Sequence, residues 1–575
     1  MFPIKKRIKL LLIVLCLGSL MLSACDVFGS PAPKQLVKAP KNKQVYTLPE
    51  VGISDIDTLD PALAHDSASI AMVQMMFTGL VQLDNKLQVH PQLAASWNVG
   101  ADGVTWTFHL KKNLHFSDGT PLTSKNVAYS IDRALQPTTQ STVAPLYLSL
   151  IKDSDQLLAG RITTLINDSL QTPDDSTLVI VAKKKAAYFL NMLTYTCSYV
   201  VEKSLITKYG TKFTDHLAHG GGAGPFTLVK YIHGQELDFA PNKNYYNPQP
   251  QLQLVRVAFY RQASDAYQAY QHATIDTVGV TQATYAKDKK RQDFFQIPQL
   301  WINYYTMNYL TKPFDNIHIR QAFALAINKT AIANSAWQGT VLPTNHIVPQ
   351  GMPGYNTALK GPDGTQNLTG NAKKAQTLLK QGLQEEQWSS VAQVPPITLT
   401  YAAGIANADQ EVAAMIAQWK KVLGISVTAN PIDYNTLLDK VTAATNNASG
   451  LQFWGLAWVG EYPDPQDWLT LQFDNGAPNN NMNYGQNTSA TSAQQQRTQQ
   501  QGTQQQLEAA DANMQLHARL RTYQQAEQQL VNDVAWIPME QVTTMFLRSP
   551  TIVGIADNRQ NIIPPDDWAK IYRVE

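Results

Sequence analysis

Residues 105–135, TWTFHLKKNLHFSDGTPLTSKNVAYSIDRAL, carry a strong fold signal. The first six of these residues alternate polar and apolar side chains, which is typical of a strand with one buried face. Residues 117–119 then predict a turn, and Thr123 or Ser124 can cap a helix. The apolar stripe of that helix would be Val127, Ile131 and Ala134. A strand followed by an amphipathic helix favours an α/β or α+β architecture over an all-β one.

The rest of the chain continues this mixture of strands and helices. We expect a strand at 254–259 with a helix starting near Ser264, and a helix from about Ile319 to Trp337. A further helix is expected from Leu507 through Leu530, before a strand-like segment at 534–539. Residues 479–506 are rich in Asn, Gln, Ser and Thr, which predicts a mobile surface excursion.

Length and composition exclude several classes of protein. A chain of 575 residues is too long for one ordinary core, so two or more domains are expected. Its formal net charge of +2 supplies little field for collecting nucleic acid, which we therefore exclude as a partner. Nucleophile-elbow, phosphate-loop and zinc-peptidase motifs are absent from the sequence, so an enzyme is not the leading class.

The N-terminus has the pattern of an export signal. Four basic residues among positions 5–9 precede an apolar run at 10–17, and Leu22-Ser23-Ala24-Cys25 follows. This ending resembles the lipobox of bacterial lipoproteins, which implies that residues 1–25 are a signal and that Cys25 is acylated. The alternative is an uncleaved anchor helix. Residues 26–45 contain prolines and lysines but few large apolar residues, which predicts a flexible tether. Cys197 is then left without a disulfide mate and is interpreted as a buried small hydrophobe.

Two motifs that suggest ligand chemistry have simpler interpretations. Gly220–Gly224 lacks the ending of a phosphate loop, so a flexible turn entering a strand is expected. His216 and His219 are spaced for chelation, but only Asp215 lies near them and no further ligands complete a shell. We therefore expect neither a metal nor another cofactor.

The segment FWGLAWVGEYPDP, residues 453–465, carries more information. Strand periodicity puts Trp454, Leu456 and Trp458 on one face. That face can belong to the core, or it can form the aromatic wall of a pocket with Glu461 at the end of the strand. A carboxylate beside aromatic walls suits an ammonium group.

Several separated motifs together resemble a known family, the extracytoplasmic peptide-binding lipoproteins of ABC importers (bacterial extracellular solute-binding proteins, family 5). They occur in that family's order along the chain. The motifs are TLDP (58–61), GLV (79–81), PQLAASW (91–97), residues 105–130, GAGPF (222–226), MN (307–308), KPFDN (312–316), RQAFALAI (320–327) and residues 458–465.

The resemblance implies a two-lobed α/β clamp of the periplasmic-binding-protein kind (type II, large cluster C-like). Lobe I would comprise residues 46–306, with an extra subdomain at about 78–205, and would be rejoined by residues 541–575. Lobe II would comprise residues 307–540, including the polar excursion. A hinge would lie near residues 303–308 and 538–543, and closure of the lobes would bury the ligand.

The resemblance also implies a ligand site. Glu461 aligns with an acidic residue, usually aspartate, that pairs with a peptide's α-ammonium in oligopeptide-binding members. Trp458 matches the motif's tryptophan, while Tyr304 and Tyr434 fall where relatives place ligand-facing aromatic residues. With Trp454, these are the predicted binding residues. Gly455 stands where some relatives have arginine, so recognition of a short peptide's carboxylate is not indicated.

The function implied is a monomeric, lipid-anchored receptor on the outer face of the bacterial cell membrane. It would capture oligopeptides and deliver them to an ABC permease. One alternative is the same clamp binding an oligosaccharide or another small solute, with Trp454 and Trp458 stacking on sugar faces. The others are an exported hydrolase using Glu461 and Asp464 as an acid/base pair, and a receptor that signals without transport.

Overall fold

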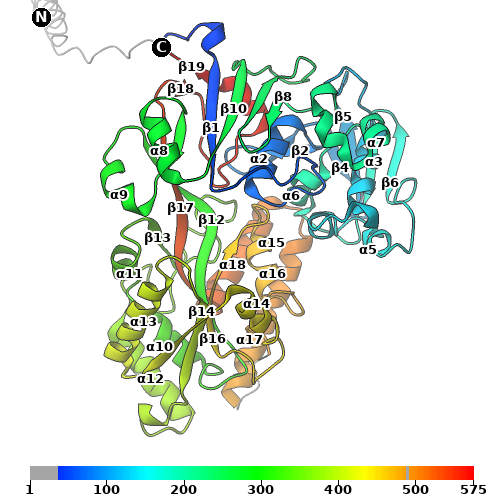
Figure 1. The fold of residues 1–575 in the computed structure, drawn as a ribbon. Coiled ribbons are helices and arrows are strands. Elements are labelled where there is room, and N and C mark those ends of the chain that lie inside the picture. Colours follow the sequence, from blue (N-terminus) through cyan, green and yellow to red (C-terminus); the bar gives the residue numbers. More distant parts are fainter. Residues whose placement is uncertain (1–35, 487–490) are drawn as a thin grey trace, which may run out of the picture.

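Two long strands join the upper body of the molecule to the lower one (Figure 1). They are β12 (Phe294–Met307) and β17 (Ile537–Arg548), which pair antiparallel. Their register shifts between Pro298 and Ile302 and again between Asn303 and Tyr304, and such irregularities bend a strand pair locally. The predicted hinge falls on this crossing. The computed structural model describes residues 36–486 and 491–575, so the predicted signal and Cys25 lie outside the described residues.

The upper body, lobe I, is built on a four-stranded sheet of order β1-β10-β9-β8, in which β1 and β10 are parallel. Its strands are β1 (Val45–Val51), β8 (Phe226–Ile232), β9 (Glu236–Pro241) and β10 (Leu254–Tyr260). Helix α2 (Ser67–Met76) shares its hydrophobic core. The expected strand at 254–259 and the turn before β8 are both confirmed. Gly222 is required there, because a Cβ would lie 2.1 Å from the carbonyl oxygen of Met76.

A small unit of lobe I packs on the upper end of β17 through its own apolar cluster. It comprises α8 (Ala263–Gln271), β11 (Thr277–Gly279) and α9 (Gln282–Asp288). The expected helix near Ser264 is therefore confirmed.

The subdomain has a second four-stranded sheet, of order β4-β5-β7-β6. The strand predicted at 105–110 is β5, and the helix after it is α3 (Ser124–Leu135), with Thr123 as its N-cap. Val127, Ile131 and Ala134 are buried, as their spacing predicts. The remaining elements here are β2 (Val81–Leu83), β3 (Val89–Pro91), β4 (Ala94–Val99), η2 (Pro137–Thr139), α4 (Ala144–Tyr147), α5 (Ser154–Leu158), β6 (Leu170–Asp174), β7 (Thr177–Val181), α6 (Phe189–Met192), η3 (Thr196–Ser198), α7 (Lys203–Tyr209) and η4 (Gly210–His219).

Lobe II extends the sheet of β12 and β17, in the order β11-β17-β12-β16-β14-β15, with β13 added on β17. The expected single helix at 319–337 is wrong, because two helices occupy this stretch. Asn328 breaks it by capping the second helix, and its side chain accepts a hydrogen bond from the amide of Ala331 (2.9 Å). The elements are α10 (Ile317–Leu325), α11 (Lys329–Ser335), β13 (Val341–Pro343), α12 (Ala372–Glu385), η5 (Val391–Gln393), β14 (Ile397–Ala402), α13 (Ala408–Leu423), β15 (Val427–Ile432), α14 (Tyr434–Thr442) and β16 (Phe453–Val459).

The polar excursion predicted at 479–506 is largely helical. Helix α17 (Thr491–Ala512) packs on α18 (Leu516–Asn532), so the expected continuous helix at 507–530 is also wrong. Gln504 explains why this polar segment packs as a helix, since its buried side-chain amide donates to the carbonyl oxygens of Phe473 (2.8 Å) and Tyr484 (3.0 Å). Composition predicts solvation of glutamines, but here they hydrogen-bond buried main chain. Helices α15 (Pro465–Trp468) and α16 (Thr470–Phe473) precede this region.

The C-terminal segment returns to lobe I, where β18 (Ile552–Val553), η6 (Pro565–Lys570) and β19 (Tyr572–Arg573) lie. The end of the predicted tether docks on it. Lys38 forms a bridge with Val574, η1 (Lys41–Lys43) follows, and the Gln44 amide donates to the carbonyl oxygen of Arg573 (2.9 Å). A tether can therefore extend no further than about residue 37. Within the described ranges, the helices are too short or too polar to cross a bilayer.

Candidate functional site at the junction of the lobes

The aromatic face of β16 is split between the core and the surface. Pairing with β12 places Trp454, Leu456 and Trp458 on one face, as predicted. Trp454 is only 1% exposed and lies in the core of lobe II, whereas Trp458 is half-buried at the edge of that core. The prediction of Trp454 as a ligand-facing residue is therefore wrong for this structure, because its indole has no open face.

Glu461 lies where lobe II meets the subdomain. Its Oε2 accepts a hydrogen bond from the hydroxyl of Tyr147, at the end of α4 (2.5 Å). The main-chain amide of Glu461 and the indole Nε1 of Trp458 both donate to Oδ2 of Asp467 (3.0 and 3.2 Å). Asp467 thus fixes Trp458 and Glu461 relative to each other. Burial, with the charges of Glu461 and Asp464, raises the pKa of Asp467 well above its usual range.

Tyr147 is a site residue that the sequence does not reveal. It is 314 positions from Glu461, and its own segment has no motif that indicates a role. Its ring stacks on Tyr195 with a centroid separation of 3.6 Å, and the Tyr195 hydroxyl donates to the carbonyl oxygen of Ala64 (3.1 Å). Burial and the neighbouring Glu461 raise the pKa of Tyr147, so it remains a hydrogen-bond donor. The subdomain, lobe II and the loop before α2 therefore meet at one place.

Asp464 is structural. Arg519 donates to both of its carboxylate oxygens, through Nη1 to Oδ2 at 2.8 Å and through Nη2 to Oδ1, and both side chains are buried. Asp464 also accepts from the amide of Gln466 (3.0 Å) as the N-cap of α15. Both carboxylate oxygens of Asp464 therefore already accept hydrogen bonds. Asp464 is not available as the acid/base partner of Glu461 that the hydrolase hypothesis needs.

Tyr304 and Tyr434 lie near each other but differ in access. Tyr304 is 6% exposed and stacks on Trp536 with centroids 3.6 Å apart and planes 8° from parallel. Burial and Tyr434 raise the pKa of Tyr304. Tyr434 begins α14 and is 50% exposed, so it presents the larger aromatic surface.

The space beside Gly455 is filled by a tyrosine ring. A Cβ on Gly455 would lie 2.5 Å from Cε1 of Tyr305. Tyr305 cannot easily move, because it is buried and its hydroxyl donates to Oε1 of Glu411 (2.8 Å). A residue larger than glycine at 455 would thus disturb the packing of the sheet.

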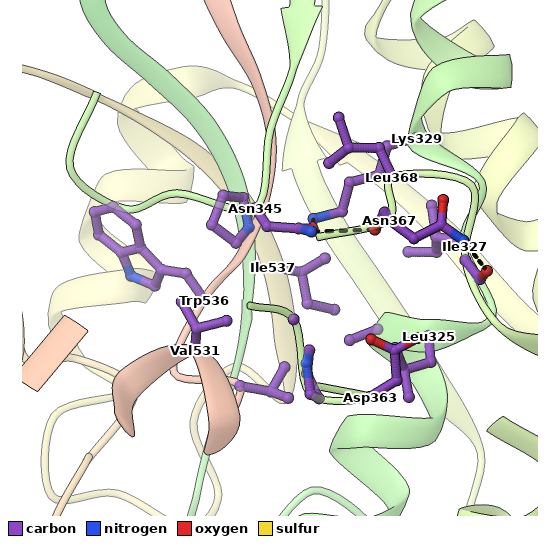
Figure 2. A pocket seen from close by; sticks show the side chains of 16 residues that line it. Leu325, Ile327, Lys329, Asn345, Asp363, Asn367, Leu368, Val531, Trp536 and Ile537 are labelled. Atoms are coloured by element: carbon purple, nitrogen blue, oxygen red, sulfur yellow. Dashed lines mark hydrogen bonds between the residues drawn. The ribbon is translucent and has the colours of Figure 1, made fainter. Parts of the chain in front are cut away.

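Two hollows of the described structure lie apart from this junction, since neither is lined by Glu461, Trp458 or Tyr147. The larger, about 320 Å³, lies in lobe I between β1, α2, β11, β17 and residues 555–568. The smaller, about 30 Å³, lies in lobe II beside Lys329, whose Nζ donates to Oδ1 of Asn345 (2.6 Å; Figure 2). It has room for water but not for a solute. The sequence reveals neither of them, since each is lined from distant segments.

The possible metal ligands of the described ranges form a single group, Asp57, His65 and Asp66, before α2. The side chains of Asp57 and His65 are 67% and 56% exposed. We assign no ion to this solvated group. The histidine pair at 216 and 219 is not part of it.

The fold and this junction define a class: a two-lobed solute-binding clamp. The profile of the family "Bacterial extracellular solute-binding proteins, family 5 Middle" matches residues 88–480, more than half of the chain. The chain therefore belongs to this family, as the sequence motifs indicated, and members of the family are solute-binding proteins rather than enzymes.

Individual relatives are distant but extend over most of the chain. The oligopeptide-binding protein OppA of Bacillus subtilis (strain 168) is 24% identical over 84% of this chain and 86% of its own. The probable deoxycholate-binding periplasmic protein YgiS of Escherichia coli (strain K12) is 25% identical over 79% and 82%. Among solved structures, the unliganded open form of the murein tripeptide-binding protein MppA has a TM-score of 0.79 and 24% identity, over 94% of this chain and 99% of its own. The two-lobed fold is confirmed.

Proposed function

We propose that this protein is the extracytoplasmic substrate-binding lipoprotein of an ABC importer, which captures oligopeptides between its lobes and delivers them to a membrane permease. Cys25 would carry the lipid, and a segment ending near residue 37 would hold the body away from the membrane. The protein would act as a monomer.

The observation that carries the proposal is the placement of Glu461. Its carboxylate lies between lobe II and the subdomain and is held by the Tyr147 hydroxyl, while its main-chain amide and the indole of the half-buried Trp458 both donate to Asp467. An ammonium about 4 Å away would gain about 4 kcal/mol at an effective dielectric constant near 20, before desolvation is subtracted. Glu461 would thus anchor the amino end of an extended peptide. The remaining length would be held by main-chain hydrogen bonds, which are indifferent to side chains.

The oligosaccharide alternative loses its main support, because Trp454 is enclosed in the core and only one indole of the pair is open to a sugar face. Because one relative is named as a probable deoxycholate-binding protein, solutes other than peptides stay as alternative ligands.

The test is mass spectrometry of the molecules that co-purify with the natively folded protein, followed by calorimetry with the peptides found. Scattering should report a smaller radius of gyration on saturation, because the ligand must favour the closed state. A co-purifying sugar or sterol, with no binding of peptide pools, would refute the peptide assignment.

A further inference from the structure

The cavity of about 320 Å³ in lobe I is large enough for part of a ligand, since ligand pockets typically start near 300 Å³. Tyr46, Leu48 and Glu50 alternate along β1 and all three line it. Its other walls are mainly apolar. They include Met72, Met75, Phe546, Ile555, Ile563 and Trp568.

The charges in this cavity are not balanced. Arg548 donates to both oxygens of Asp557 at 2.8 Å and lies over the ring of Phe295 (4.2 Å), so its charge is already neutralised. Glu50 forms neither a hydrogen bond nor an ion pair through its carboxylate with any residue of the described ranges. Burial and the charge of Asp66 raise the pKa of Glu50 to about 7. A partly buried carboxylate without a partner is unfavourable, and a bound cation would relieve it.

Helix α2 links the cavity to the junction of the lobes. The cavity runs along this helix, whose N-cap is Asp66. The loop before α2 contacts the junction, because the carbonyl oxygen of Ala64 accepts from the hydroxyl of Tyr195, which stacks on Tyr147 beside Glu461. A ligand whose amino end lies at Glu461 would have to extend along α2 to reach this cavity.

We propose that the lobe I cavity binds an ammonium group on an aliphatic stem, such as a lysine side chain of the peptide, with Glu50 as its counter-ion. The apolar walls take the stem and the carboxylate takes the charge. This inference rests on the proposed function for its ligand, and it makes the receptor selective for peptides with a basic residue.

The first experiment is calorimetry of purified protein with five pentaalanine peptides, each carrying one lysine at a different position, and with five matched peptides carrying norleucine. At one position lysine should bind at least tenfold more tightly than norleucine. Glu50→Gln should abolish this preference. Glu236→Gln, on strand β9 outside the cavity, should retain it, and thermal melting should show that both variants fold. Equal binding of lysine and norleucine peptides at every position, or a preference that persists in Glu50→Gln, would overturn the inference.

A second measurement separates the cavity from the proposed function. Hexylammonium, titrated at millimolar concentration, should bind the wild type and not Glu50→Gln, while 1-hexanol should bind neither tightly. Hexylammonium binding in a protein that binds no peptide would support the cavity and refute the peptide receptor. Failure of hexylammonium to bind the wild type would overturn the cavity assignment, even if alanine peptides bind.

Discussion

Asn303 and Glu540 are joined by a hydrogen bond of 2.9 Å, from Nδ2 to Oε1, across the two strands that connect the lobes. Asn303 lies next to a shift in register, and its own Oδ1 accepts from the indole of Trp301 (2.9 Å). Glu540 is buried and also hydrogen-bonds Glu411, a second buried carboxyl group. Burial and the neighbouring Glu411 raise the pKa of Glu540 well above its usual range. The crossing of the strands is thus fixed by a polar network rather than by apolar packing alone.

Replacing Asn303 by aspartate should weaken this network. The substitution keeps the acceptor for Trp301 but replaces the donor to Glu540 with a third carboxyl group, so we expect a loss of about 1–3 kcal/mol at pH 7. Chemical unfolding would measure it, with Asn435→Asp on the exposed start of α14 as the control. An equal effect of the two substitutions would show that the network adds nothing.

Glu461→Gln should weaken binding of a free-amine peptide roughly tenfold, or about 1.4 kcal/mol, and leave its N-acetylated form nearly unchanged. The reason is that the amide keeps the shape but loses the charge that faces the ammonium. Calorimetry on both peptides checks this. Tyr147→Phe, which removes only the hydroxyl that holds Glu461, is the companion variant and should have a smaller effect of the same kind. Equal losses for the two peptides would reject Glu461 as the anchor.

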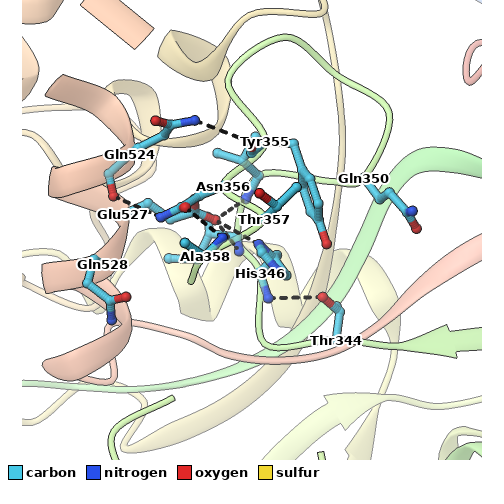
Figure 3. Close-up of polar contacts among 12 residues, drawn as sticks. Thr344, His346, Gln350, Tyr355, Asn356, Thr357, Ala358, Gln524, Glu527 and Gln528 are labelled. Atoms are coloured by element: carbon cyan, nitrogen blue, oxygen red, sulfur yellow. Dashed lines mark hydrogen bonds and ion pairs between the residues drawn. The ribbon is translucent and has the colours of Figure 1, made fainter. Parts of the chain in front are cut away.

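Stability should fall as pH rises from 5 to 7, and Glu527 is one cause. Burial raises its pKa to about 8, although Oε1 accepts from the amides of Ile347 (3.0 Å) and Val348 (2.9 Å). Figure 3 shows the loop that contains His346 and Tyr355 next to Glu527 on α18. Because the folded state binds the proton more tightly, the stabilisation is complete below the unfolded pKa near 4.5 and is lost as pH approaches 8. The change between pH 5 and 7 is about 2 kcal/mol.

Glu527→Gln should flatten that pH dependence, because the amide does not titrate. Melting temperatures at several pH values would measure it. The exposed Glu508→Gln on α17 should keep the wild-type slope. A slope unchanged in Glu527→Gln would mean that other buried acids account for it.

Gly455→Ala should destabilise the sheet by about 1–3 kcal/mol, since its Cβ would overlap the fixed ring of Tyr305. Gly502→Ala makes a sharp comparison. It lies in α17 with nothing within 4 Å of the added Cβ, so alanine there should stabilise by up to about 1 kcal/mol. Opposite signs in urea unfolding are expected, and a neutral Gly455→Ala would show that Tyr305 can move.

Gln504→Ala should cost about 1–3 kcal/mol, because the buried carbonyl groups of Phe473 and Tyr484 each lose one donor and keep that of Asn480. Gln505→Ala, the adjacent exposed residue, should be close to neutral. Similar small effects of both substitutions would mean that α17 is held by its apolar residues alone.

The class of fold, the elements with strong periodicity and the family all follow from patterns in the sequence. Residues 105–135 form the strand and capped helix that their pattern predicts, because alternation and capping act over a few residues. Trp454, Leu456 and Trp458 share a face for the same reason. The periodicity of a sequence does not show how far along a face the core extends. For this reason Trp454 is predicted to face a ligand but lies in the core of lobe II.

The remaining features are visible only in the folded chain. The Tyr147 hydroxyl donates to Glu461, Arg519 pairs with Asp464, and Gln504 hydrogen-bonds buried main chain. Within the described ranges, Glu50 lines a cavity without a polar partner. Each of these results depends on contacts between segments far apart in the chain. The free energy of a polar side chain depends on its partners and on the water it loses, and neither quantity is encoded in the residues adjacent to it.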